Sequence, residues 1–503
     1  MGFYYDRYTD ERAADNNIFR SITPESKAVP TFEEIKHLLP KPYWQGNDDT
    51  INCYWKAWEL AFKNIGTPTA ENGFVSNYLK TCFNECLFMW DSVFALMFGK
   101  YGRKAFNFQK TLDNLYCKQH VDGFICREIA ENDGTDRFHR HDPSSTGPNV
   151  MPWSEWEYYL LVSDKERLNQ VYPVLAAYHN WLKAWRTWPD GSYWSSGWGT
   201  GMDNQPRPKP GDHPEFYHGH MTWVDACLQM IFSAKTLVKM AKALNREEEA
   251  ASFEEEARAL TLYVNEQLWN KDSYFDLYSD GTLSNVRTIG VYWALLADIV
   301  PADRLDAFVA SLEDPKRYNR THRVPSMPAD SPSYCPEGNY WRGGVWVFTN
   351  YMLLRGLTNT GYDTLAYEIA LNHVSNVVKV FNETGTIWEN YSPEAVKQGN
   401  PALPDFVGAG GISPIAVLFE YIFGIRASAH ENMLVWDVRR LEAHGVDNYP
   451  FGISGVLNLA CKTRQSESEE PEIAITSNIP LDVMVKWNNG TQSKIIKLRP
   501  NSD

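Results

Sequence analysis

Helical periodicity dominates the chain from about residue 46 to about residue 425. Apolar side chains recur three or four positions apart, which places them on one face of a helix. One such stripe carries Tyr54, Trp58, Ala61 and Ile65. Other stretches predicted to be helical are 90–100, 104–118, 155–163, 174–185, 228–241, 247–269, 289–298, 302–312, 343–357, 362–380 and 414–423. Roughly twelve helices follow from the pattern, and no series of strands alternates with them, which disfavours a parallel α/β sheet.

The connections between these helices are very uneven in length. Segments 128–152, 189–219, 315–342 and 381–413 are long and rich in Gly, Pro, Asn and aromatic residues. Long loops in a compact domain are usually functional or disordered, and these contain too many Trp and Tyr residues to be disordered. A dozen helices in antiparallel pairs suit a toroid of six inner and six outer helices better than a simple bundle. We therefore predict a mainly α fold, an (α/α)6 barrel over 46–427, with the long loops building a site at one mouth.

The two ends of the chain differ from this pattern. Residues 1–45 carry Pro30, Pro40 and Pro42 and little periodicity, so we expect an irregular arm packed on the barrel. From about residue 430 the apolar period changes to two, and Asn489-Gly490 is a hairpin turn signal. A small β-sandwich is predicted over 428–503, with strands at 433–439, 456–461, 472–476, 483–487 and 494–498.

Composition narrows the classes of partner. The net charge of −15 disfavours nucleic acid, because phosphate binding needs a basic field. No apolar run approaches the ~20 residues of a membrane span, and Met1 to Arg20 lacks the apolar core of a signal peptide, so a cytoplasmic location is expected. Among the eight cysteines, Cys82 and Cys86 lie four residues apart without further ligands at zinc spacing, so free thiols are expected. The sequence holds no signal for the oligomeric state.

Four clusters carry residues that can do chemistry. They are Met89-Trp90-Asp91-Ser92-Val93-Phe94, Ser196-Gly197-Trp198-Gly199-Thr200-Gly201-Met202-Asp203-Asn204, Gly338-Asn339-Tyr340-Trp341-Arg342-Gly343-Gly344-Val345-Trp346 and Ile387-Trp388-Glu389-Asn390-Tyr391. Asp203 is flanked by Gly and aromatic residues, whose apolar surroundings raise a carboxyl pKa and keep it protonated. Glu389 lies between Trp388 and Asn390, where neighbouring amides can keep it ionised. Glycoside hydrolysis needs such a pair, although Asp203 as a turn residue and Glu389 as a surface charge fit the spacing too.

Taken together and in this order, the four clusters resemble glycoside hydrolase family 63 and its relatives, which include trehalases and the mannosylglycerate and glucosylglycerate hydrolases. The resemblance covers roughly residues 45–425. It implies an (α/α)6 barrel whose members invert anomeric configuration, with the acid at Asp203 and the base at Glu389. Gly344 departs from the family, which commonly has Pro there. No cofactor or metal is implied.

The resemblance also implies supporting residues around the substrate. Trp90 and Asp91 look like a stacking and hydrogen-bonding pair at the −1 sugar, or else a core Trp with a helix-capping Asp. Tyr391 could orient the base, Arg127 and Glu128 are either a pocket ion pair or structural, and Trp346 is either a subsite wall or core. His213, His218 and His220 leave a metal site open, with loop and capping roles preferred. The remaining expected substrate-binding residues are Trp153, Glu155, Trp198, Tyr340, Trp341 and Arg342.

The substrate is less sharply defined than the reaction. A short α-glucoside, cleaved by an inverting exo-acting enzyme, is the leading hypothesis. Glucosylglycerate or mannosylglycerate is the alternative, and its carboxylate would need Arg or a cluster of Tyr, Gln and Trp donors. Two more distant alternatives are a polysaccharide lyase on a similar toroid, which would use a Tyr/His pair, and a non-catalytic sugar-binding protein.

Overall fold

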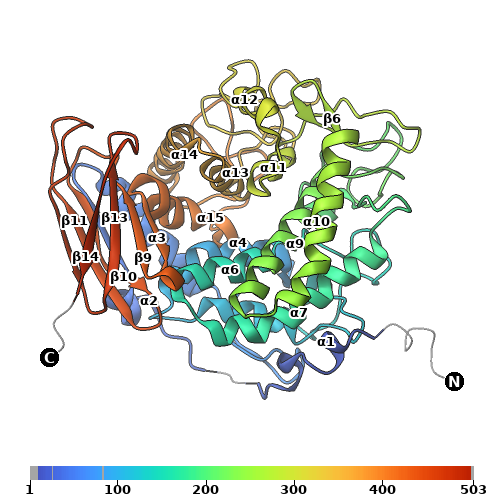
Figure 1. Ribbon diagram of the computed structural model, residues 1–503, viewed down its shortest axis with the longest axis horizontal. Coiled ribbons are helices and arrows are strands. Elements are labelled where there is room, and N and C mark those ends of the chain that lie inside the picture. Colours follow the sequence, from blue (N-terminus) through green and yellow to red (C-terminus); the bar gives the residue numbers. More distant parts are fainter. Residues whose placement is uncertain (1–8, 25–26, 82–83, 500–503) are drawn as a thin grey trace.

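The computed structural model describes residues 9–24, 27–81 and 84–499. The chain is mainly helical and ends in a region of strands (Figure 1). Within the described part of the chain, no helix is both long and apolar enough to cross a membrane. Cys53, Cys86 and the other described cysteines are unbridged, and Cys82 lies outside the described residues.

Six elements contact one another in sequence and close a ring. They are α4 (Met89–Gly99), α6 (Met151–Val162), α9 (Val224–Ala243), α11 (Trp293–Leu296), α13 (Val347–Asn359) and the π-type helix η7 (Ile412–Ile422), which returns to α4. Every residue of α4 and of η7 is buried. A helix that is apolar on all sides needs neighbours on all sides, and the ring together with its outer layer provides them.

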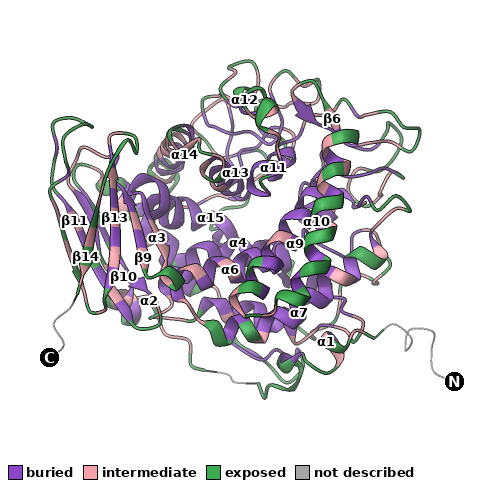
Figure 2. Ribbon diagram, in the orientation of Figure 1, coloured by how far each residue is buried: buried purple, intermediate pink, exposed green. Residues whose placement is uncertain are grey.

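The outer helices are amphipathic. In α10 (Glu247–Gln267) the buried residues are spaced three to four apart along the face that packs on α9. Its solvent side is green in Figure 2, while the ring helices are purple. The other outer helices are α3 (Asp48–Lys63), α7 (Lys165–Trp185), α12 (Ala302–Ala310) and α14 (Asp363–Thr384).

Short elements fill the connections. They are α1 (Glu11–Ala14), η2 (Ile18–Ser21), α2 (Phe32–Ile35), η3 (Lys36–Leu38), η4 (Lys100–Gly102), η5 (Phe108–Leu112), α5 (Asp113–Tyr116), α8 (Gly197–Thr200), η6 (Ile289–Tyr292), α15 (Val407–Gly410) and η8 (Ala429–Glu431). Short two-stranded pairs are β2 (Ile65–Gly66) with β3 (Tyr78–Leu79), β4 (Cys86–Phe88) with β5 (Glu128–Ala130), and β6 (Trp269–Asn270) with β7 (Ser273–Tyr274).

Several of the predicted helices differ from the structure. The stretch 289–298 is the 3-10 turn η6 followed by the short helix α11. The stretch 104–118 is not one helix but the 3-10 turn η5 followed by the single turn α5. The helix predicted over 343–357 begins only at Val347, because Trp346 is extended and Gly343 adopts a φ of 142°. Ile65 also lies beyond the end of α3, where it pairs with Leu79.

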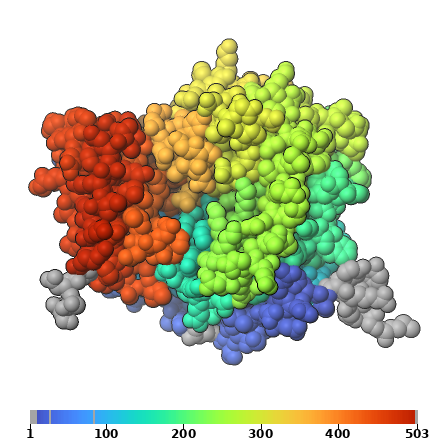
Figure 3. All heavy atoms as spheres, in the orientation of Figure 1, coloured from blue at the N-terminus to red at the C-terminus, as the bar shows by residue number. Residues whose placement is uncertain are grey.

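The C-terminal region has two four-stranded sheets. One has the order β1-β10-β11-β12 and the other β14-β13-β9-β8. The strands are β1 (Lys41–Trp44), β8 (Ile425–Ser428), β9 (Met433–Asp437), β10 (His444–Phe451), β11 (Gly455–Cys461), β12 (Ile473–Ser477), β13 (Leu481–Trp487) and β14 (Gln492–Leu498). Alternate residues of β13 are buried, as expected for strands with one face on a core. The region packs directly against the helices (Figure 3), and β8 and β10 both contact α6.

The N-terminal arm is not irregular throughout, which corrects the expectation for residues 1–45. Its residues Lys41–Trp44 form β1, which pairs antiparallel with β10 at the edge of the C-terminal sheet. The prolines hide this strand in the sequence, but Pro42 lies on an edge strand, where the missing N–H costs no ladder hydrogen bond.

Candidate active site

A cavity of about 670 Å³ opens among the long loops, and a recess of about 70 Å³ continues from it. Residues shared by both parts are Phe88, Arg127, Trp198, Asp203, Tyr340 and Glu389. Trp90, Asp91, Trp341 and Trp346 line the inner recess, while Arg137, Phe138 and Leu403 line the outer part. All four clusters singled out in the sequence therefore reach one cavity.

Asp203 follows a tightly built turn. The Ser196 hydroxyl accepts a hydrogen bond from the Gly199 N–H and caps the short helix α8. Gly201 ends α8 with a φ of 74°, and a Cβ there would lie 3.1 Å from the Trp90 ring. A residue without a side chain is thus required for the loop to approach the tryptophan so closely.

The residues after Asp203 tie its loop to the third cluster. Asn204 Oδ1 accepts a hydrogen bond from the Trp341 N–H at 2.9 Å, and Asn204 Nδ2 donates to the Asn339 carbonyl at 3.0 Å. Gln205 Nε2 donates to the Ser326 carbonyl at 3.0 Å. In the sequence Asn204 is only one member of a motif, and its bridging role shows only in three dimensions.

Glu389 is held by hydrogen bonds that favour its ionised form. The Leu403 N–H donates to Glu389 Oε2 at 3.1 Å, and the Tyr340 hydroxyl lies 3.5 Å from Oε1. The Asn390 side chain does not contribute, because its amide donates to the Pro401 carbonyl. The amide that supports Glu389 is therefore a backbone N–H from 14 residues further along the chain, not the neighbour expected from the sequence.

The cavity brings three carboxyl groups into one electrostatic environment. Burial raises the pKa of Asp203 to about 7 and that of Glu389 to about 7. Burial, together with the charge of Glu389, raises the pKa of Asp91 to about 8. Arg127 lowers the pKa of Asp203, and the Leu403 N–H lowers that of Glu389. Carboxyls that titrate near neutrality in a cleft are able to exchange protons with a substrate.

Aromatic rings form the walls of the recess. Trp341 and Trp346 stack with ring centroids 4.1 Å apart and planes at 3°. Trp90 packs against Phe94 and Phe348 behind the wall and keeps a small exposed edge. Trp198 lies under the Arg127 guanidinium, which is 5.3 Å from its ring centroid. Flat apolar walls with a few polar groups are the usual form of a small-molecule site.

Four residues that we expected to contact the substrate do not line either part of the cavity. Trp153 is a core residue, stacked on Tyr351 with its indole N–H donated to Glu157. Glu155 is buried in an ion pair with Arg167 at 2.7 Å, so its charge is already satisfied. The prediction that Trp153 and Glu155 line the pocket is wrong. Both residues belong to α6, whose first turns are buried in the ring.

The other two are Arg342 and Tyr391. Arg342 lies in the loop beside the cavity, and its carbonyl accepts a hydrogen bond from the Cys335 N–H. Tyr391 is buried, and its hydroxyl accepts a hydrogen bond from the Trp388 N–H at 3.2 Å. Tyr391 also exchanges backbone hydrogen bonds with Val345. It therefore holds the backbone on either side of Glu389 without touching the carboxylate.

The glycine at position 344 has a structural explanation. Its N–H donates to the Gly338 carbonyl at 3.0 Å, and a Cβ would lie 2.3 Å from the Tyr340 carbonyl oxygen. Proline has no N–H to donate and carries a ring at this place, so this loop conformation requires glycine.

The remaining open alternatives concern charged and histidine residues. Arg127 and Glu128 form an ion pair at 2.5 Å, and both line the outer cavity. His220 Nδ1 lies 2.6 Å from the Tyr217 hydroxyl, and His218 Nδ1 accepts the His220 N–H. Across the described residues, no three His, Cys, Asp or Glu side chains are grouped closely enough to hold a metal ion.

The amino-acid sequence was compared with protein families and with known proteins. The model of the mannosylglycerate hydrolase MGH1-like glycoside hydrolase domain matches residues 57–398. An uncharacterized protein of Borreliella burgdorferi is 22% identical over 433 residues, covering 82% of this chain and 88% of that protein. The probable mannosyl-oligosaccharide glucosidase of Schizosaccharomyces pombe is 22% identical over 276 residues, 48% of this chain but only 33% of its own length.

A solved structure shows the same fold. The GH63 mannosylglycerate hydrolase of Thermus thermophilus, in complex with Tris and D-glycerate, superposes with a TM-score of 0.59 at 19% identity. The match covers 72% of this chain and 99% of that one. The predicted resemblance to family 63 is confirmed. Because the family model matches more than half of the sequence, the chain belongs to the MGH1-like glycoside hydrolases and is an enzyme that hydrolyses glycosidic bonds.

Proposed function

We propose that the protein is an inverting, exo-acting α-glycoside hydrolase with Asp203 as general acid and Glu389 as general base. The observation that carries the proposal is that these two carboxyl groups share one cavity but differ in their hydrogen bonds. Glu389 accepts hydrogen bonds that favour the carboxylate, while no other described residue donates one to the Asp203 side chain. Such a difference in environment sets one carboxyl to donate a proton and the other to accept one.

The proposed reaction is a single displacement. Asp203 protonates the glycosidic oxygen as the bond to C1 breaks, and Glu389 takes a proton from the water that attacks the opposite face of C1. Inversion requires the two carboxyl groups to be about 6.5–9.5 Å apart, so that the water fits between Glu389 and the sugar. No cofactor takes part in the scheme.

The ring of contacts supports a more specific fold. We propose that α4, α6, α9, α11, α13 and η7 are the inner ring of an (α/α)6 barrel, with α3, α7, α10, α12 and α14 in its outer layer. The clusters at the ends of the inner helices then explain why Trp90, Asp91 and Trp346 meet the residues of the long loops in one cavity.

The shape of the cavity supports a short substrate. The aromatic walls of the recess, Trp90, Trp341 and Trp346, suit the faces of one sugar ring, and the wider outer part gives room for the rest of a short substrate. A short α-glucoside is the proposed substrate, consistent with the glucosidase activity named for the yeast relative. We propose Asp91, Trp198 and Tyr340 as further substrate contacts, because they line the recess.

A second candidate is glucosylglycerate or mannosylglycerate. Arg127 and Arg137 line the outer cavity, where a glycerate carboxylate would lie, and the structural relative from Thermus thermophilus binds D-glycerate. A lyase is less well supported, since no histidine stands beside Tyr340 among the described residues that line the cavity.

The catalytic assignment is tested by Asp203→Asn and Glu389→Gln. Each variant keeps the size of the side chain and removes its proton chemistry, so turnover of the wild-type substrate should fall by about 100-fold or more while binding persists. The measurement is turnover together with calorimetric binding of the same sugar. Undiminished turnover in either variant would overturn its assignment, and binding without turnover in the wild type would favour a sugar-binding protein.

A further inference from the structure

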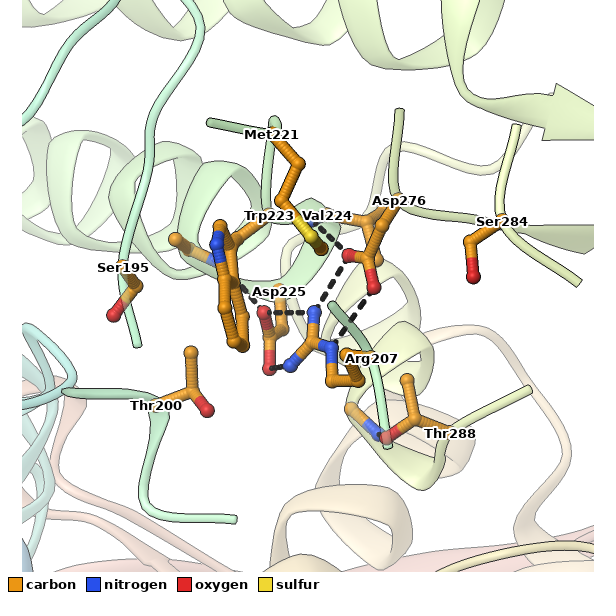
Figure 4. Close-up of polar contacts among 12 residues, drawn as sticks. Ser195, Thr200, Arg207, Met221, Trp223, Val224, Asp225, Asp276, Ser284 and Thr288 are labelled. Carbon is orange, nitrogen blue, oxygen red and sulfur yellow. Dashed lines mark hydrogen bonds and ion pairs between the residues drawn. The ribbon is translucent and has the colours of Figure 1, made fainter. Parts of the chain in front are cut away.

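Arg207 lies four residues after Asp203 and is completely buried. Its guanidinium lies between the carboxylates of Asp225 and Asp276 (Figure 4). It donates to Asp225 through two nitrogens at 2.6 and 2.7 Å, and to Asp276 through two at 2.9 and 2.7 Å. The guanidinium also lies over the Trp223 ring, and its central carbon is 4.3 Å from the ring centroid. Four of the five N–H groups of this guanidinium are thus bonded to carboxylates inside the protein.

Both carboxylates belong to firmly held parts of the fold. Asp225 is in the first turn of α9, a helix of the inner ring, and its Oδ1 accepts the Ala226 N–H. Asp276 Oδ1 accepts the Val224 N–H at 2.9 Å, which joins the segment after β7 to the same helix start. Carboxylates at a helix N-terminus are favoured by the helix dipole. Arg207 is therefore attached to the frame of the ring itself.

Hydrogen bonds hold the segment between Asp203 and Arg207 in place. The Tyr278 hydroxyl donates to the Arg207 carbonyl at 3.1 Å, and Gln205 and Asn204 are tied to the loops that carry Ser326 and Trp341. Asp203 is the residue in this run that projects into the cavity. A buried ion pair adds little net stability compared with apolar packing, but it fixes a geometry, because a misplaced charge would be left unpaired.

We propose that Arg207 is a positioning residue for the general acid: paired with Asp225 and Asp276, it fixes the loop so that the Asp203 carboxyl reaches the glycosidic oxygen. The proposal rests on the assignment of Asp203 as acid in the proposed function. A displacement of about 1 Å at a reacting group can cost about 100-fold in rate.

The test uses a leaving group that needs no proton. Fluoride departs from α-D-glucosyl fluoride unprotonated, so a displaced acid slows hydrolysis of a disaccharide but not of the fluoride. We expect Arg207→Lys, which cannot form two bidentate pairs, to lower kcat on the cleaved α-glucoside by about 100-fold while kcat on the fluoride stays within about threefold.

A matched control is Arg167→Lys. Arg167 is also buried between two carboxylates, those of Glu155 and Asp113, but it joins α6, α7 and α5 away from the cavity. The Arg167→Lys substitution should lower thermal stability and change kcat on both substrates by the same factor. Asp276→Asn, which removes one of the two pairs and leaves Asp225 in place, gives a milder version of the test if Arg207→Lys does not fold.

The outcomes separate the two claims. Equal losses on both substrates in Arg207→Lys or Asp276→Asn, or no loss in a folded variant, would overturn the positioning role. Asp203→Asn is measured alongside and should show the same selective loss. If Asp203→Asn lost both activities equally, the acid assignment itself would fail, and the proposal for Arg207 with it.

Discussion

At the residue scale, three of the four carboxyl groups that line the cavity, Asp91, Asp203 and Glu389, affect one another's pKa, while the fourth, Glu128, is paired with Arg127. Asp203 raises the pKa of Glu389, and both raise the pKa of Asp91, in addition to the larger effect of burial. Three carboxylates cannot all be ionised in so small a space without a large electrostatic cost. These pKa values near neutrality are what the proposed mechanism requires of a carboxyl that protonates a glycosidic oxygen.

The pH dependence of kcat/KM follows from these values. Glu389 must be ionised to act as base, so activity should fall as the pH drops below its pKa of about 7. Asp203 must be protonated to act as acid, so activity should also fall as the pH rises above its pKa of about 7. We expect a bell-shaped profile with its maximum near neutrality, whose limbs belong to the coupled pair.

The measurement is the pH profile on the cleaved α-glucoside and on α-D-glucosyl fluoride. With the fluoride, the alkaline limb should disappear, because no acid is needed, and the acidic limb should remain. A profile that stays flat from about pH 5 to about pH 9 would contradict the roles given to both residues.

Sequence reasoning predicted that Asp203 and Glu389 share a site, and both line the cavity, but it missed the groups that support them. Asp203 and Glu389 stand in distinctive motifs, but Leu403 acts through its backbone N–H, which leaves no signature in the sequence. Trp153 and Glu155 were misplaced because a motif at the start of a buried helix resembles one that faces a cavity. Whether a Trp faces core or substrate is decided by packing, which periodicity does not show.

At the element scale, a buried ion network ties four elements together at the ends of the ring helices. Glu420 on η7 lies 3.1 Å from Lys100, which follows α4, and 3.3 Å from Arg355 on α13. Glu157 on α6 also contacts Lys100, at 3.2 Å. The hydroxyls of Tyr101 and Tyr351 donate to Glu420 at 2.7 and 2.8 Å. Arg355 also contacts Glu157, so the network links neighbours around the ring and, between α13 and α6, elements on opposite sides of it.

Glu420→Gln should destabilise the protein. The substitution keeps the shape but leaves Lys100 and Arg355 with one carboxylate between them, which should cost about 3–5 kcal/mol in the free energy of unfolding. Chemical denaturation followed by tryptophan fluorescence measures the change. Glu472→Gln, which breaks the exposed pair with Lys462, is the control and should leave the midpoint unchanged. An equal midpoint in both variants would show that the network is not needed for stability.

Long elements were predicted better than short ones. The stripes of α7, α9, α10 and α14 are long enough for their period to be distinct. The strands β1 and β10 were not predicted from the sequence, because Pro42 and Pro450 interrupt the alternation of apolar and polar residues. Their pairing also joins residues about 400 positions apart, and a local sequence pattern cannot indicate such a contact.

At the scale of the whole molecule, the helical ring, the loops and the C-terminal sheets form one connected core. The buried cluster runs from Trp58 and Phe98 through Phe419 and Phe423 to Trp436 and Tyr449. The N-terminal arm connects the sheets to the helices, because β1 pairs with β10 of a C-terminal sheet and α3 begins only a few residues after β1. A rigid frame of this kind lets long loops hold catalytic groups in fixed positions.

The stereochemistry of the first product tests the catalytic scheme most directly. Wild-type enzyme is mixed with kojibiose, nigerose, maltose, isomaltose, trehalose, glucosylglycerate and mannosylglycerate in turn, and proton NMR follows the released sugar from the first minutes. With Asp203 and Glu389 acting in a single displacement, one α-linked member is cleaved and the sugar attacked at C1 appears first as the β-anomer; trehalose would give equal amounts of both anomers, because its leaving glucose keeps the α configuration. First appearance of the attacked sugar as the α-anomer, or of α-glucose alone from trehalose, would show retention and contradict the mechanism.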